Sequence, residues 1–64
     1  MMNLNDIDRA ARDIIASNRL TADNSNRAQR LHCIDAYLDF EPPTDRMTIL
    51  RILTRIDQLL DDAS

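Results

Sequence analysis

The residues of this chain best suited to chemistry are its single histidine and single cysteine, which are adjacent as His32 and Cys33. A cysteine acts as a nucleophile when a histidine base hydrogen-bonds to it. Adjacent residues on a helix point about 100° apart, which prevents that hydrogen bond. We therefore interpret Cys33 as a small apolar residue on the inner side of a helix and not as a nucleophile.

A metal site is a second candidate, because His32, Asp35 and Asp39 share one helix face at spacings of three and four residues. Imidazole and carboxylate groups bind several divalent metals. An ordinary solvated polar stripe has the same spacing, and the sequence places no second cluster of ligands beside it. We therefore expect the protein to hold no metal and no cofactor.

The sequence features of other enzyme classes are also missing. A Gly-rich phosphate-binding loop requires glycine, and the chain contains none. The paired carboxylates Asp61 and Asp62 lie near the end of the chain, where a helix is expected to fray. We therefore expect a protein that is not an enzyme.

Two arginines are the first candidates for binding a partner. Arg51 and Arg55 lie one turn apart on the polar face of a helix expected over residues 45–61. Such a pair can hold a carboxylate or a phosphate through charge-assisted hydrogen bonds. A plain solvated face is the alternative interpretation of the same spacing.

A second set of polar residues, Asn26, Arg27, Gln29 and Arg30, opens another expected helix. Residues of these types read base edges near the start of the recognition helix in helix-turn-helix proteins. The connection before them, 18–24, is longer than the usual turn, and the net charge of −3 opposes binding to nucleic acid. A small dimeric DNA-binding transcriptional regulator is therefore the alternative function.

The elements that must position these side chains are helices. The chain has no Gly, Val or Trp, and its apolar residues are mainly Leu, Ile and Ala, which favours helix over sheet. Apolar periodicity predicts an all-α single domain with three helices, over about 5–17, 25–39 and 45–61. In the first helix, Leu4, Ile7, Ala11 and Ile14 form the apolar line.

Capping residues set the expected ends of these helices. Asn5 and Ser25 are expected to cap the first two, with Thr21 as another start for the second. The third helix begins after Thr44 or Asp45. Before it, the segment Glu41-Pro42-Pro43 ends the second helix, because proline disfavours the α conformation in the residue that precedes it.

The third helix has the widest apolar face. Its apolar residues cover an arc of roughly 180°, whereas an amphipathic surface helix needs about 100°. A chain of this size has a marginal core, and one cysteine excludes an internal disulfide. We therefore expect a homodimer with this helix as its seam, and a self-contained bundle is the alternative. The residues expected at this dimer seam of the third helix are Ile49, Ile52, Leu53, Ile56, Leu59 and Leu60.

The order of a helix, an Asn-rich connection, a helix, a short break and an apolar helix resembles the small three-helix dimeric regulators of bacterial biofilm and stress responses. Small acidic helical proteins are also common among phage products that block host machinery. The sequence has no signal peptide and no membrane-spanning run, so we expect a cytoplasmic protein. We predict a non-enzymatic protein-binding adaptor or inhibitor, with phage or another mobile element as a candidate source.

Overall fold

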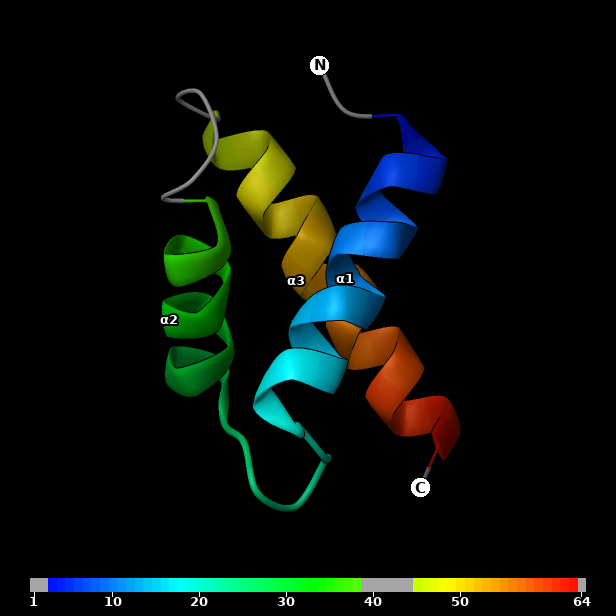
Figure 1. Cartoon of the computed structure of the whole chain (residues 1–64), viewed down its shortest axis with the longest axis vertical. Helices are drawn as coiled ribbons and strands as arrows, with labels where there is room; N and C mark the ends of the chain where they lie inside the picture. The colour runs from blue at the N-terminus through cyan, green and yellow to red at the C-terminus, as the bar shows by residue number, and fades with distance from the viewer. Residues whose placement is uncertain (1–2, 39–44, 64) are drawn as a thin grey trace.

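The computed structural model describes residues 3–38 and 45–63, and within these ranges it contains three helices and no strand. The helices are α1 (Leu4–Asn18), α2 (Arg27–Leu38) and α3 (Arg46–Ala63). They pack together as one three-helix unit (Figure 1). The prediction of an all-α fold with three helices is therefore confirmed.

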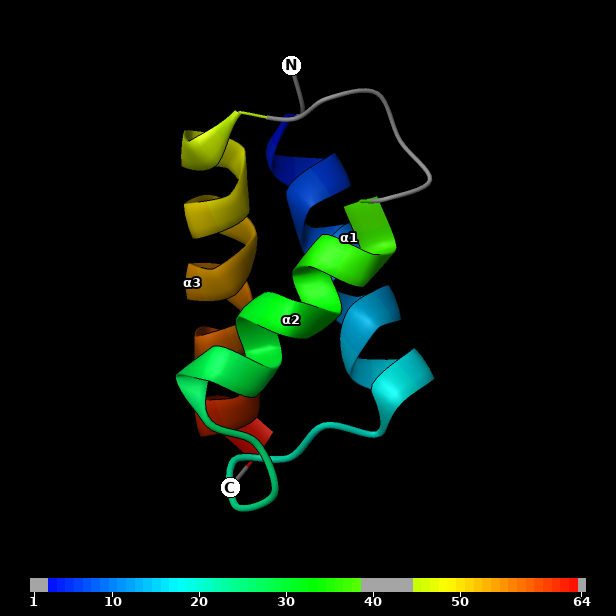
Figure 2. The ribbon, with the colours of Figure 1, turned by 90° about the vertical axis from the view of Figure 1, so that its left-hand side faces the viewer.

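The three helices alternate in direction along the chain, so that α1 and α3 run the same way (Figure 1). The contact between α1 and α3 is the most extensive of the three helix contacts. Figure 2 shows α2 crossing obliquely over one side of this pair. No described helix covers the opposite side of this pair (Figure 1).

The N-cap of helix α1 lies two residues before the expected one. Asn3 is the N-cap, and its Oδ1 accepts a hydrogen bond of 2.9 Å from the backbone N–H of Asp6. The expected cap, Asn5, lies inside the helix. At the other end Arg19 adopts a left-handed conformation with φ of 52°. The following residue, Leu20, donates its N–H to the carbonyl of Ile15, which closes the helix.

Helix α2 is capped by Asn26 and not by Ser25 or Thr21. The Asn26 side chain accepts from the N–H of Gln29 at 2.9 Å, and the Gln29 side chain accepts from the N–H of Asn26 at 3.0 Å. This reciprocal pair is a capping box. Ser25 is buried, and its hydroxyl donates to the carbonyl of Thr21 at 2.7 Å, so it closes the connection instead of starting the helix.

Helix α3 is capped as predicted by one of the two expected residues. The Asp45 carboxylate accepts from the N–H of Thr48 at 2.8 Å. This hydrogen bond from the Thr48 backbone, followed by one from its side chain, lowers the pKa of Asp45 below its ordinary value of 3.8. The break predicted at Glu41-Pro42-Pro43 lies outside the described residues.

One apolar core holds the three helices together, and α3 contributes to it from two sides. Arg55 on one flank of α3 bonds to Asp8 of α1, and Arg30 of α2 bonds to Asp57 on the other flank. Most of the wide apolar arc of α3 is packed against α1 and α2, and Leu50 on this arc is 40% exposed. The core residues are Ile7, Ala10, Ala11, Ile14, Ile34, Ile52, Leu53, Ile56 and Leu60.

Most of the residues expected at a dimer seam contribute to this core. Four of the six lie in the core of a single chain, where they are at most 4% exposed: Ile52, Leu53, Ile56 and Leu60. The other two, Ile49 and Leu59, are half-buried against that core. A second copy could reach the four core residues only if the helices separated. The homodimer itself stays a prediction.

Candidate functional site

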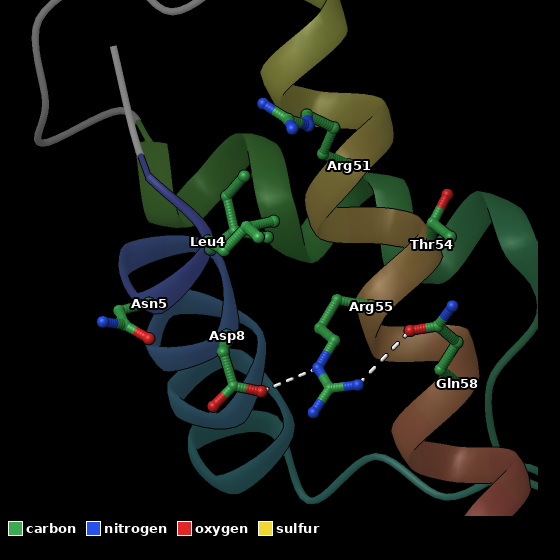
Figure 3. A pocket seen from close by; sticks show the side chains of 8 residues that line it. Leu4, Asn5, Asp8, Arg51, Thr54, Arg55 and Gln58 are labelled. Carbon is green, nitrogen blue, oxygen red and sulfur yellow. Dashed lines mark hydrogen bonds and ion pairs between the residues drawn. The ribbon is translucent and has the colours of Figure 1, made fainter.

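A shallow groove of about 460 Å³ lies where α1 and α3 run side by side (Figure 3). It forms one end of a longer line of contact between these two helices. We call this line the α1–α3 seam, and define it as running from Leu4 and Arg51 at one end to Ile15 and Leu59 at the other. The seam brings together residues that are far apart in the sequence.

A chain of charged side chains crosses the middle of the seam. Asp8 accepts from Nε of Arg55 at 2.6 Å and from Nε of Arg12 at 2.8 Å. Arg55 also donates to Oε1 of Gln58 at 3.3 Å, as the dashed lines in Figure 3 show. The hydrogen bonds from Arg12 and then Arg55 lower the pKa of Asp8. These contacts tie α1 to α3, so Arg55 has a structural role.

The lowered pKa of Asp8 predicts a loss of stability in acid. The folded protein favours the carboxylate, so this contribution is present above the ordinary value of 3.8 and disappears as the pH falls through the lower folded pKa. In Asp8→Asn, this contribution is missing at every pH. We expect the difference in melting temperature between wild type and Asp8→Asn to shrink as the pH falls from about 5 to about 2.

Thermal unfolding followed by circular dichroism at a series of pH values measures this difference. Asp35→Asn, at an exposed position on α2, is the matched control for removing one carboxylate. A wild-type advantage over Asp8→Asn that stayed constant across the acid range would contradict the proposed role of the Asp8 carboxylate.

Arg51 differs from Arg55 although both were predicted as partner contacts. Its side chain is exposed, and it makes no hydrogen bond or ion pair with residues 3–38 or 45–63. In Figure 3 it extends away from the Asp8–Arg55 pair, and it lines the same groove as Leu4. Leu4 is 73% exposed. An exposed guanidinium beside an exposed leucine can bind a carboxylate and an apolar group at the same time.

The other end of the seam is an apolar hollow of about 520 Å³. Its walls come from the last turns of α1, from residues 20–23 of the connection to α2, and from residues 59–60 of α3. Its apolar lining consists of Ile15, Ala16, Leu20, Ala22, Leu59 and Leu60. Leu20 packs against the core, as its apolar character suggests, but the hollow beside it depends on the path of the connection.

Exposed apolar side chains also depart from the sequence expectation. Leu4 belongs to the apolar line predicted for α1, yet it is largely exposed, because it is the first residue of the helix and extends past the core. Leu50, on the apolar arc of α3, is 40% exposed, whereas Met47, which is 64% exposed, lies outside that arc. Helical periodicity assigns such residues to a face but does not show where that face ends.

The four residues proposed for DNA binding have different surroundings. Asn26 and Gln29 form the capping box of α2. The side chain of Arg30 is only 14% exposed and bonds to Asp57. Arg27 is exposed. One of the four side chains is therefore exposed without a capping or ion-pair role in the described part of the chain.

The histidine and cysteine lie at a different surface, in the middle of α2. His32 is exposed and Cys33 is half-buried against the core. Asp35 is exposed, and Asp39 lies outside the described residues. Within the described ranges, no group of three His, Cys, Asp or Glu side chains is arranged to hold a metal ion.

Comparisons with known protein families, with curated proteins and with solved structures found no match for this chain. The resemblance to dimeric biofilm and stress regulators therefore stays a prediction. Among the helices described, none has both the length and the apolar content that crossing a bilayer requires.

Proposed function

We propose that this protein is a small non-enzymatic protein-binding module, acting as an adaptor or inhibitor of a macromolecular partner through its α1–α3 seam. Arg51 is the principal charged contact. The observation that carries the proposal is the exposed Arg51 beside the exposed Leu4, next to an Arg55 that is already bound to Asp8. Arginine beside apolar surface is typical of the residues that dominate protein interfaces.

The seam also has a favourable charge for such a partner. Asp8 bonds to Arg12 and Arg55 and not to Arg51, and the charge of Arg51 also acts on Asp45, the N-cap of α3. A partner with a carboxylate near an apolar side chain could contact Arg51 and Leu4 together. Because the whole chain has a net charge of −3, this positive position would also orient an acidic partner toward one place on the surface.

DNA binding is the weaker alternative. The side chains of Asn26 and Gln29 already complete each other's hydrogen bonds at the helix start, and reading bases would break the capping box. Arg30 would have to leave Asp57. Asp35 lies exposed further along α2, where it would repel phosphates.

Affinity capture from a lysate of the encoding organism tests the proposal. The bait is the full chain, compared with Arg51→Ala and with Arg27→Ala, which replaces another exposed arginine, on α2. We expect one protein to be captured by wild type and Arg27→Ala, and its capture to fall about tenfold or more with Arg51→Ala.

The opposite pattern would support the DNA-binding regulator. In that case the chain would bind duplex DNA with a steep inverse dependence on salt, and Arg27→Ala would weaken this binding while Arg51→Ala would not. Capture that was equal for wild type and Arg51→Ala would contradict the role proposed for Arg51.

A further inference from the structure

The two ends of the α1–α3 seam differ in their apolar surface. At one end Leu4 borders the shallow groove and is 73% exposed, and at the other end an apolar hollow lies beside Ile15 and Leu59. Leu4 and Ile15 are eleven residues apart on α1, which is about 17 Å along a helix. A surface with a protruding group at one end and a hollow at the other fits a copy of itself turned end to end.

The charges of α3 follow the same pattern. Arg51 and Asp62 are also eleven residues apart, which is close to three helical turns, so both lie on one line of the helix. Both are exposed, and neither has an ion pair within the described ranges. Turning the seam end to end would place each arginine opposite an aspartate.

The two patterns share one centre. The midpoint between Leu4 and Ile15 lies at residues 9–10, and the midpoint between Arg51 and Asp62 lies at residues 56–57. The parallel register of the helices, set by the bond between Asp8 and Arg55, places these two midpoints side by side. A single two-fold axis through this point therefore satisfies the apolar and the charged contacts together.

We propose that a second copy of this chain docks on the α1–α3 seam about this axis, with α1 against α1 and α3 against α3 in antiparallel pairs. Leu4 enters the apolar hollow of the other copy, and Arg51 pairs with Asp62 of the partner subunit. This inference rests on the proposed function. The second copy covers the α1–α3 seam until a macromolecular partner displaces that copy.

Exchanging the charges at positions 51 and 62 tests this arrangement. Sedimentation equilibrium of the full chain measures the mass of each variant in solution. We expect wild type to have twice the 7.4 kDa chain mass. Arg51→Asp and Asp62→Arg should each weaken the dimer about tenfold or more, because each places like charges opposite each other twice. The double variant Arg51→Asp/Asp62→Arg should regain the wild-type dissociation constant within about threefold.

Mixing the two single variants gives a stricter test. In a heterodimer of Arg51→Asp with Asp62→Arg every pair again has opposite charges, so the mixture should dimerise although neither variant does alone. Leu4→Ala should also weaken the dimer while leaving the helix content unchanged, because Leu4 lies outside the core. Arg27→Asp, on α2, is the charge control and should have no effect.

Two results would overturn the inference: a wild-type chain that stays monomeric at about 0.1 mM, or a dimer unaffected by both single charge reversals. The affinity-capture experiment distinguishes a failure of the proposed dimer from a failure of the proposed function. If the chain is a monomer but still captures a partner through Arg51, only the proposed dimer is refuted. If the chain forms a charge-dependent dimer but captures no partner through Arg51, only the proposed adaptor function is refuted.

Discussion

Replacing Ile56 with alanine is expected to lower the free energy of unfolding by about 2–5 kcal/mol. Ile56 is 0% exposed and belongs to the core cluster shared by all three helices. The substitution removes buried methyl and methylene groups and leaves a cavity that close-packed neighbours fill incompletely. Urea denaturation followed by circular dichroism measures the change.

Leu50→Ala is the matched control for this substitution. Leu50 lies on the same helix but is 40% exposed, so its truncation should cost less than about 0.5–1 kcal/mol. An Ile56→Ala cost below about 0.5 kcal/mol would contradict the packing of α3 at the centre of the unit. Protein concentration must be held constant, because dimer formation would add to the measured stability.

Replacing Arg30 with alanine is expected to cost about 1–3 kcal/mol. The Arg30 side chain is 14% exposed and donates to Oγ of Ser25 at 3.0 Å and to its carbonyl at 3.1 Å. It also forms the ion pair with Asp57 that ties α2 to α3. Its removal leaves the buried Ser25 with fewer hydrogen bonds and Asp57 without its arginine.

A double-mutant cycle separates the two parts of this effect. In an Asp57→Asn background, Arg30→Ala should cost less than in wild type, because part of its interaction is already lost. Arg27→Ala, three residues earlier and exposed, should change stability by less than about 0.5 kcal/mol. Equal small costs for Arg27→Ala and Arg30→Ala would contradict the interhelical role of Arg30.

The stability of Arg30 variants also affects any test of DNA binding. A chain in which Arg30 is replaced could lose activity because α2 detaches from α3. Arg27 has no such structural role in the described part of the chain. It is therefore the arginine whose substitution tests a nucleic-acid contact directly.

The positions of the helices follow from local patterns in the sequence. Apolar spacing predicts all three, and Asp45 caps α3 as expected, because helix formation and capping depend on residues within one or two turns. The first two caps were shifted by one or two residues. Asn3 and Asn5 are equally suitable by type, as are Ser25 and Asn26, so residue type alone does not choose between them.

The roles of side chains within a face depend on the tertiary structure. Arg51 and Arg55 are equivalent by periodicity, yet α1 brings Asp8 to Arg55 and leaves Arg51 exposed. Leu4 fits the apolar line of α1 but extends past the core. The wide face of α3, whose pattern alone favours a second copy, is mostly packed against α1 and α2. Periodicity determines which residues share a face, but what covers that face depends on contacts between residues far apart in sequence, such as Asp8 and Arg55.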